Sequence, residues 1–470
     1  MRRNQLVILT LAGIVAISIV LMVRMRHSHS RSPQLRGTSA IVLIDFSKSF
    51  VTWDHQGRTH GLRYEDRRAL SIAAGAMNEL ALRYWTPPVK VIWTRIQTSS
   101  ITAEPLCTFD ITPKLVKTES DTISSEEEIR EAMKKCVDSV VEASKNERLL
   151  SNYTDISGAL SMASEMSSTA RSERVLIILS DFKEDLPPGS KKATFELAGE
   201  RVIMLHRPGT DEPESVAGYL ARIADWKTKL LKHGAKSVVA LPVFAVTQKR
   251  LRAALHPQDI EQHGTDVNIL IDFKRHVFQT LVNKRAGSRL VQIGKTLANL
   301  ARDWAPPVTV SWMTMGPSGF ASKTFPPIEF TPSLIKKENM INTIEEFATA
   351  MEEVARAIPN MSRSINATDI SGSLALACAV EPRAKSQVLV VISDFIDSTT
   401  SPMVFELGSK ARVIMLHIAS PTDRLDPNAY AARRRAWEQR FKQSGAKAVC
   451  QLPLVSFTAN DLRSCLSASN

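Results

Sequence analysis

The chain is an internal repeat, because five segments of its first half return in the same order in its second half. The matching pairs are "RYWTPPVKVIW" (83 to 93) with "RDWAPPVTVSW" (302 to 312), "TDISGAL" (154 to 160) with "TDISGSL" (368 to 374), "VLIILSDF" (175 to 182) with "VLVVISDF" (388 to 395), "RVIMLH" at both 201 and 412, and "GAKSVVALP" (234 to 242) with "GAKAVCQLP" (445 to 453). Two copies of one domain of about 200 residues, a common domain size, therefore make up most of the chain. The period is too long for a solenoid of short repeats.

Each copy alternates short β-branched runs with stretches of helical periodicity. In copy one we expect strands near residues 40 to 45, 89 to 97, 174 to 180, 201 to 206 and 236 to 241, and helices near 64 to 84, 124 to 147, 156 to 168, 214 to 232 and 246 to 255. Runs such as "VLIIL" are continuously apolar, which is typical of strands buried on both faces of a mainly parallel sheet. The sequence therefore predicts an α/β fold with two tandem, doubly wound, Rossmann-like domains.

The segment before the repeat indicates a membrane anchor. Residues 6 to 23 carry no charge, and as a helix they would span roughly 27 Å, about the thickness of the bilayer hydrocarbon. A cleaved signal peptide is the alternative, but the run is longer than the usual apolar core, and bulky and basic residues follow it where a cleavage site would need small ones. We expect a tail at 1 to 5, a transmembrane helix at 6 to 23, a basic linker at 24 to 38, domains at 39 to 256 and 266 to 470, and a linker between them at 257 to 265.

The charges around this segment leave its orientation open. Arg2 and Arg3 precede it and four arginines follow it before residue 37, which favours a cytoplasmic body, but long domains cross membranes largely regardless of charge. Because a short basic segment before an apolar run is the usual signal-anchor arrangement, we expect a bacterial inner-membrane protein with an extracytoplasmic body. Half of the net charge of +12 lies in residues 1 to 36, so the basicity indicates a membrane surface, and we expect no nucleic-acid partner.

Cysteines and glycosylation sequons add little about the compartment. The five cysteines form no CxxC pair and do not match between the copies, so they leave the redox environment open. Sequons beginning at residues 152, 360 and 366 would put glycans beside or near the loops discussed next, which disfavours a secreted eukaryotic setting.

Oxygen-bearing side chains in copy one follow two expected strands and open one expected helix. Asp45, Ser47 and Ser49 follow the run "IVLI", Thr154 opens a helix, and Asp181 follows "VLIILS". In open α/β sheets the ligand site lies outside the carboxyl ends of the strands, so these loops should meet. Hydroxyls and carboxylates there suit a hard cation such as Mg²⁺. The alternative is that they only cap helices, where Ser, Thr and Asp satisfy free amides.

This D-x-S-x-S pattern, followed by Thr154 and then Asp181, resembles the von Willebrand factor type A (VWA) domain and its metal-ion-dependent adhesion site. The resemblance covers about 200 residues twice. It implies one Mg²⁺ or Mn²⁺ ion in the first domain, held directly by the hydroxyls of Ser47 and Ser49 and, in one state, by Thr154. Asp45 and Asp181 would lie mostly behind coordinated water. Copy one departs from the family's pattern in the long stretch from 99 to 150.

Copy two keeps the acids of this pattern but loses both serines. Its strand "VNILID" ends in Asp272, Lys274 and His276 stand where the two serines stand in copy one, and Thr368 and Asp394 are retained. Two carboxylates that face each other repel unless a cation lies between them. The ammonium of Lys274 could be that cation, or it could turn to solvent as long lysines often do. In either case we expect no metal in copy two.

Two classes of function fit these residues. The first is a membrane-anchored module that binds a protein partner by completing the metal's coordination with an Asp or Glu carboxylate, and that performs no catalysis. By family analogy, a cytoplasmic VWA partner of a ring ATPase is a variant of it. The second is a metal-dependent hydrolase. Because no histidine lies in the three motif loops of copy one to serve as a base, we favour the binding module.

Overall fold

The structure is a computed structural model that describes residues 37–53, 56, 59–111, 119–167, 173–209, 215–256, 264–272, 274–281, 289–300, 304, 308–317, 327–330, 367–381, 386–399 and 402–467. The expected tail, the expected anchor at 6 to 23 and most of both expected linkers lie outside these residues. In the part of the chain that is described, no helix is both long and apolar enough to cross a membrane.

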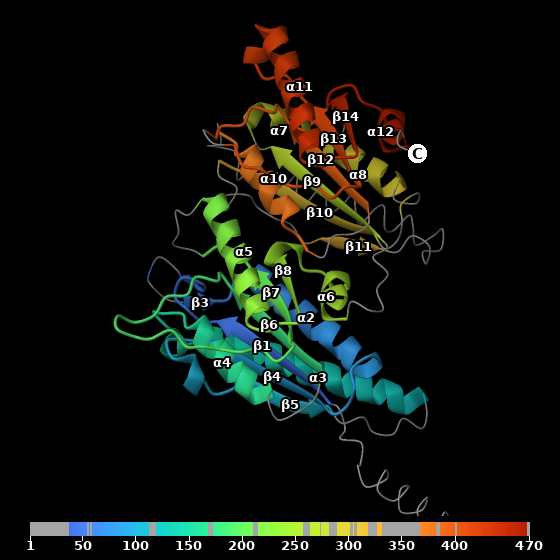
Figure 1. The fold of residues 1–470 in the computed structure, drawn as a ribbon. Coiled ribbons are helices and arrows are strands. Elements are labelled where there is room, and N and C mark those ends of the chain that lie inside the picture. Colours follow the sequence, from blue (N-terminus) through green and yellow to red (C-terminus); the bar gives the residue numbers. More distant parts are fainter. Residues whose placement is uncertain are drawn as a thin grey trace, which may run out of the picture.

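The first sheet is six-stranded, with the order β5-β4-β1-β6-β7-β8 (Figure 1). Its strands are β1 (Thr38–Asp45), β4 (Val89–Ile96), β5 (Cys107–Ile111), β6 (Glu173–Ser180), β7 (Arg201–His206) and β8 (Ser237–Pro242). All neighbours pair in parallel except β5, which is antiparallel to β4. Counted along the chain, the order of these strands is that of a doubly wound sheet, in which the chain turns back from one sheet edge to build outward from β1 in the other direction.

Helices cover both faces of this sheet. One face packs against α2 (Tyr64–Arg83), α3 (Glu119–Ser144) and α6 (Gln248–Leu255), and the other packs against α4 (Ile156–Ser167) and α5 (Val216–Lys232). Successive side chains of β1 point to opposite faces of the sheet. Ala40, Val42 and Ile44 pack in the core under α2, α3 and α6, whereas Ile41 and Leu43 pack in the core under α4 and α5. A strand with two buried faces must be apolar at every position, as the run "AIVLI" is. Shorter elements are β2 (Thr52–Trp53), β3 (Thr59–Gly61), η1 (Ser100–Thr102), η2 (Glu147–Leu149) and η3 (Val243–Ala245).

The second sheet repeats the first, with the order β11-β10-β9-β12-β13-β14. Its strands are β9 (Thr265–Asp272), β10 (Val308–Met315), β11 (Ile328–Phe330), β12 (Ser386–Ser393), β13 (Ala411–His417) and β14 (Ala448–Pro453), and the outer strand β11 is again antiparallel. The accompanying helices are α7 (Arg275–Leu281), α8 (Arg289–Leu300), α10 (Ile370–Cys378), η10 (Thr422–Arg424), α11 (Pro427–Gln443) and α12 (Ala459–Ser467). The predicted α/β fold with two mainly parallel sheets is confirmed, while the domain boundaries stay a prediction.

The stretch from 99 to 150 supplies an outer layer of the first domain. It holds the edge strand β5 and the long helix α3, which packs against α2 with Cys136 and Val140 buried. The described part of this stretch therefore extends the sheet and covers one face of it. In copy two, β11 takes the place of β5.

Polar contacts join the two copies at the β8 edge of the first sheet. The Nζ of Lys227 on α5 lies 2.8 Å from both carboxylate oxygens of Glu381, and one of these oxygens also accepts the N–H of Ala240 on β8. A second ion pair joins Arg250 on α6 to Asp266 on β9 over 3.0 Å, and both side chains are buried. Glu381 thus accepts a hydrogen bond from a backbone N–H of the edge strand β8, a group that would otherwise be free to pair with another strand.

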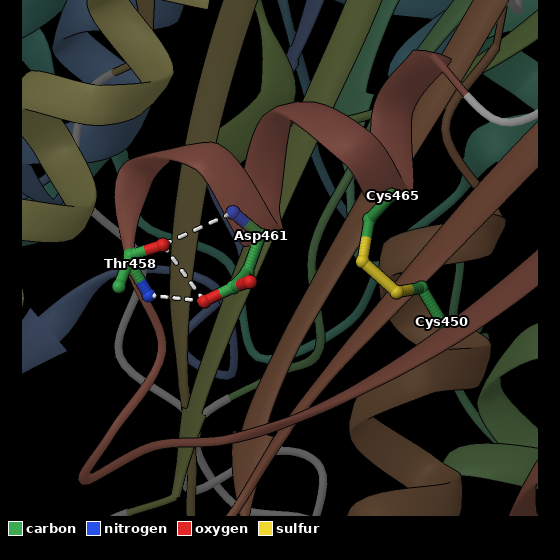
Figure 2. Close-up of a disulfide and its surroundings, with 4 residues drawn as sticks. All are labelled: Cys450, Thr458, Asp461 and Cys465. Atoms are coloured by element: carbon green, nitrogen blue, oxygen red, sulfur yellow. Dashed lines mark hydrogen bonds between the residues drawn. A yellow bond between two sulfur atoms is a disulfide. The ribbon is translucent and has the colours of Figure 1, made fainter.

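Two disulfides each tie an edge region of a sheet to a covering helix. Cys107 on β5 pairs with Cys136 on α3, and Cys450 on β14 pairs with Cys465 on α12, with Cα–Cα distances of 5.4 and 5.7 Å. Figure 2 shows the second bond near the carboxyl-terminal end of α12 and, at the start of the helix, Thr458 and Asp461 capping each other's backbone N–H groups. Cys378 remains outside both disulfides. The two bonds join different elements of the repeat, which is why comparison of the two copies gave no pairing.

Candidate metal site

Asp45 ends the central strand β1 and is completely buried. Its Oδ1 accepts the N–H of Ser47 over 2.8 Å, and its Oδ2 accepts the hydroxyl of Ser180 over 2.7 Å. Ser180 in turn accepts the N–H of Phe182. The carboxylate is therefore fixed in orientation at the carboxyl end of the sheet by donors from two neighbouring strands.

The two serines of the first loop lie together and face the second acid. The hydroxyls of Ser47 and Ser49 are 3.0 Å apart, and the hydroxyl of Ser49 donates to Oδ2 of Asp181 over 3.4 Å. Ser47 and Asp181 are buried, whereas Ser49 is half-buried. The structure thus brings four of the residues selected from the sequence into one connected group.

Backbone hydrogen bonds attach the Thr154 segment to the two loops that carry this group. Its N–H donates to the carbonyl of Asp185 over 2.8 Å and its carbonyl accepts the N–H of Asp185 over 3.0 Å, which attaches it to the loop after β6. Three residues earlier, Ser151 exchanges backbone hydrogen bonds with Phe46 and Lys48 in the loop after β1. The Thr154 segment therefore lies between the other two loops. Asp155 caps α4 by accepting the N–H of Gly158.

The loop that carries Asp181 is shaped by a left-handed residue and a close glycine. Phe182 has φ of 58°, an uncommon conformation for a bulky side chain. Its carbonyl accepts the indole N–H of Trp226 over 2.9 Å, and the carbonyl of Asp181 accepts Nε of Arg222 over 3.2 Å. A Cβ added at Gly209 would lie 2.8 Å from Oδ2 of Asp181. A side chain at position 209 would therefore crowd the carboxylate of Asp181.

Burial of two acids at one point shifts their protonation. Burial raises the pKa of Asp45, and burial together with the charge of Asp45 raises the pKa of Asp181 to about 7. Arg207 opposes both shifts from behind the first loop. Its guanidinium pairs with the buried Asp66 over 2.8 Å and stacks 3.8 Å from the ring centroid of Phe50. A divalent cation placed between Asp45 and Asp181 would relieve the same repulsion.

Sequence reasoning missed the residues that support the site from α5 and α2. Arg222 and Trp226 belong to a Tyr-x-x-Arg-x-x-x-Trp pattern that begins at Tyr219 and returns at Tyr430 in copy two. That recurrence was a usable signal, because it is one more matched segment of the repeat. The pair of Arg207 with Asp66 left no such signal, since 141 residues separate its members.

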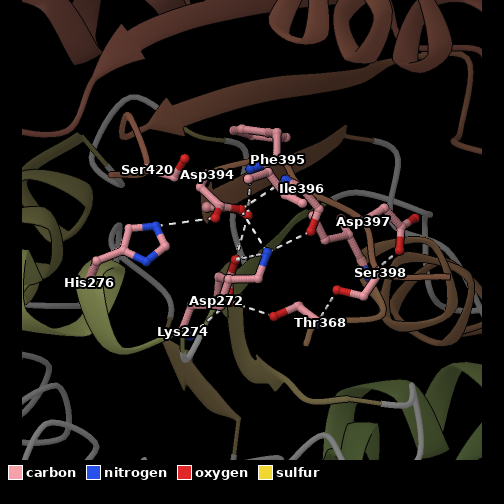
Figure 3. A network of polar contacts seen from close by, with 12 residues as sticks. Asp272, Lys274, His276, Thr368, Asp394, Phe395, Ile396, Asp397, Ser398 and Ser420 are labelled. Atoms are coloured by element: carbon pink, nitrogen blue, oxygen red, sulfur yellow. Dashed lines mark hydrogen bonds and ion pairs between the residues drawn. The ribbon is translucent and has the colours of Figure 1, made fainter. Parts of the chain in front are cut away.

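Copy two presents its two acids in the same way but places a cation between them (Figure 3). Asp272 accepts the hydroxyl of Ser393 over 2.7 Å and that of Thr368 over 2.8 Å. The Nζ of Lys274 lies 2.9 Å from Oδ1 of Asp394 and 3.8 Å from Oδ2 of Asp272. His276 approaches the outer side of Asp394, with Nε2 3.2 Å from Oδ2.

The ammonium of Lys274 and the neighbouring hydrogen bonds separate the pKa values of the two acids in copy two. Burial raises the pKa of Asp272 although Lys274 opposes the shift. Burial also acts to raise the pKa of Asp394, but the contact with His276, the charge of Lys274 and the hydrogen bonds from Ile396 and Lys274 prevail and lower it. The Asp394 carboxylate is therefore kept ionised, as expected for the partner of a buried ammonium.

The donor set of copy one fits Mg²⁺ or Mn²⁺, which prefer oxygen ligands and retain water. It offers the paired hydroxyls of Ser47 and Ser49, with the buried carboxylates of Asp45 and Asp181 adjacent. Across the described residues, no group of three or more His, Cys, Asp or Glu side chains is placed to hold a metal. The group at the end of β1 has two carboxylates, and its remaining oxygen donors are hydroxyls.

Comparison with known proteins assigns no family. No protein-family model matches the chain, and no curated protein matches it. Among solved structures, it is similar to proximal thread matrix protein 1 from the mussel byssus, at 11% identity over 92% of this chain and 96% of that chain, with a TM-score of 0.24. A structure of the same mussel protein with a zinc-occupied MIDAS motif gives 11% identity and a TM-score of 0.25. These values are too low to support a ligand or a function.

Proposed function

We propose that the chain is a metal-dependent protein-binding module whose first domain holds one Mg²⁺ or Mn²⁺ ion at the end of β1. The observation that carries this proposal is the convergence of Ser47, Ser49 and Asp181 at the buried Asp45, in the strand order of a doubly wound sheet. Ser47, Ser49 and Thr154 would hold the ion directly, and the two acids would orient its water ligands. Neutral ligands leave the ion electrophilic, which suits it to accept a carboxylate from a protein partner.

We further propose a single-pass anchor at residues 6 to 23 and a body outside the cytoplasm. The two disulfides support this location, because such bonds persist in oxidising compartments such as the bacterial periplasm and are rare in the cytosol. With the body on that side, the partner carboxylate would be presented by a periplasmic or envelope protein.

Binding of acidic peptides tests the proposed activity. A set of peptides with one Asp or Glu is compared with the matched Asn or Gln peptides, in Mn²⁺ and after EDTA, on the wild-type chain and on Ser47→Ala. We expect retention of a subset of acidic peptides only in the presence of both the metal and Ser47. Turnover of a phosphoester with Mn²⁺ that disappears in Ser47→Ala would contradict a role limited to binding.

A further inference from the structure

We infer that in copy two the ammonium of Lys274 takes the place that the proposed divalent ion takes in copy one, so that this copy keeps the same loop arrangement without an exchangeable metal. The inference rests on the proposed function for the comparison with copy one. The contacts within copy two stand by themselves.

The two copies share the serine and tryptophan hydrogen bonds that position the two acids. Each strand-end acid accepts a serine hydroxyl over 2.7 Å, from Ser180 in copy one and from Ser393 in copy two. The phenylalanine after the second acid has φ of 58° in copy one and 59° in copy two, and each accepts a tryptophan N–H over 2.9 Å. The serine and tryptophan contacts that support the two acids are therefore the same in both copies, and the main difference is the pair of side chains, Lys274 and His276, that replaces the two serines.

The side chain of Lys274 points into the protein, where its ammonium group has hydrogen-bond acceptors. Its side chain is only 7% exposed, and its Nζ donates to Oδ1 of Asp394 over 2.9 Å and to the carbonyl of Ile396 over 2.6 Å. An ammonium buried to this degree without acceptors would be very costly, so these contacts explain why it does not turn to solvent. The alternative expectation, that Lys274 turns to solvent, is therefore wrong.

Three of the four carboxylate oxygens of the pair accept hydrogen bonds, and the fourth lies beside the imidazole of His276. In Asp272, Oδ1 accepts from Thr368 and from the N–H of Lys274, and Oδ2 accepts from Ser393. In Asp394, Oδ1 accepts from Lys274 and Oδ2 faces His276. A metal at this point would have to displace the ammonium that neutralises the two acids. Copy two therefore cannot take a partner's carboxylate through a metal, and metal dependence is confined to copy one.

Conversion of copy two into a metal site tests the inference. The full-length chain carries Asp45→Asn and Ser47→Ala to remove the copy-one site, and Lys274→Ser with His276→Ser restores the D-x-S-x-S pattern in copy two. Electron paramagnetic resonance should count no Mn²⁺ in the background chain and one per chain after the two serines are added. Asp394→Asn in the same chain should return the count to none. No gain in a folded chain, or one ion in the background chain that Asp394→Asn removes, would overturn the inference.

A double-mutant cycle of Lys274 and Asp394 tests the charge role of Lys274 even if the variant with two added serines fails to fold. Lys274→Met should lower the melting temperature, and addition of Asp394→Asn should recover part of the loss, because the second change removes the charge left unpaired. Equal melting temperatures for Lys274→Met and the wild type would contradict a charge role for Lys274. Because neither experiment uses the metal site of copy one, failure of the proposed function would leave their outcome readable.

Discussion

Trp226 donates its indole N–H to the carbonyl of Phe182 over 2.9 Å, and this bond links α5 to the loop that carries Asp181. In the described residues, positive φ at a non-glycine position occurs only at Phe182 and at its counterpart Phe395, which Trp437 holds in the same way. A buried hydrogen bond to the backbone thus stabilises a conformation that the side chain alone disfavours. The position of Asp181 therefore depends on Trp226, a residue 45 positions later in the chain.

Removal of this bond should weaken the metal site. Trp226→Phe leaves the Phe182 carbonyl unsatisfied, which should cost about 1 to 2 kcal/mol of stability. Displacement of Asp181 should also weaken Mn²⁺ binding by about tenfold, equivalent to roughly 1.4 kcal/mol. The matched variant Trp437→Phe should lose similar stability but bind Mn²⁺ like the wild type. Calorimetric titration and urea denaturation of both variants measure the two effects, and equal loss of affinity in both would count against the assignment.

The buried His206 should make the fold sensitive to acid. Burial lowers its pKa from 6.5 to about 3, so between these values the unfolded chain binds a proton that the folded chain does not. The stability of the fold is therefore unaffected by this group above pH 6.5 and falls as the pH drops toward 3, by about 5 kcal/mol in total. Urea denaturation across this range should show a shallower pH dependence in His206→Gln than in the wild type. An unchanged slope would show that His206 does not govern it.

The two ion pairs between the copies should contribute unequally to the stability of the fold. Arg250 and Asp266 are 3% and 5% exposed, so Arg250→Met removes a buried charge partner of the Asp266 carboxylate and should cost about 3 to 5 kcal/mol. Lys227 and Glu381 are each about one-third exposed, and Lys227→Met should cost no more than about 1 kcal/mol. Guanidinium unfolding of the two variants compares them directly. A larger loss in Lys227→Met would reverse this ranking.

The disulfides give a direct test of the compartment. Thiol titration of the chain purified from its native host and unfolded in guanidinium should find one free thiol, that of Cys378, because the other four cysteines are paired. Reduction should lower stability by about 3 kcal/mol for each bond, since they close loops of 29 and 15 residues. Five free thiols would contradict an extracytoplasmic body.

The strands and helices of copy one were predictable from the sequence because burial on both faces leaves continuous apolar runs. The run "VLIIL" at 175 to 179 lies within β6, and the expected helix at 214 to 232 is α5 within two residues. The edge strand β5 was not predicted, because only one of its sides is paired and its residues are mostly half-buried or exposed. Edge strands lack the pattern that makes central strands recognisable.

The loop residues of the site were predictable from the sequence, but the residues that hold these loops in place were not. Asp45, Ser47 and Asp181 could be selected because parallel strands end at one edge of the sheet. The contacts of Arg207 with Asp66 and of Trp226 with Phe182 depend on how helices pack on that sheet, and local sequence patterns do not encode such packing. The position of Lys274 was open for a related reason, since a long side chain can turn inward or outward and only the burial around it decides.

The most direct test of the account is the number of divalent ions bound by the full-length chain. Titration with Mn²⁺, followed by electron paramagnetic resonance, should show one saturable ion per chain. Ser47→Ala and Asp181→Asn should each weaken binding by about tenfold or more, and the copy-two variant Asp272→Asn should bind as the wild type does. Absence of saturable binding in the wild type, or equal binding by Ser47→Ala, would contradict a metal site at the end of β1.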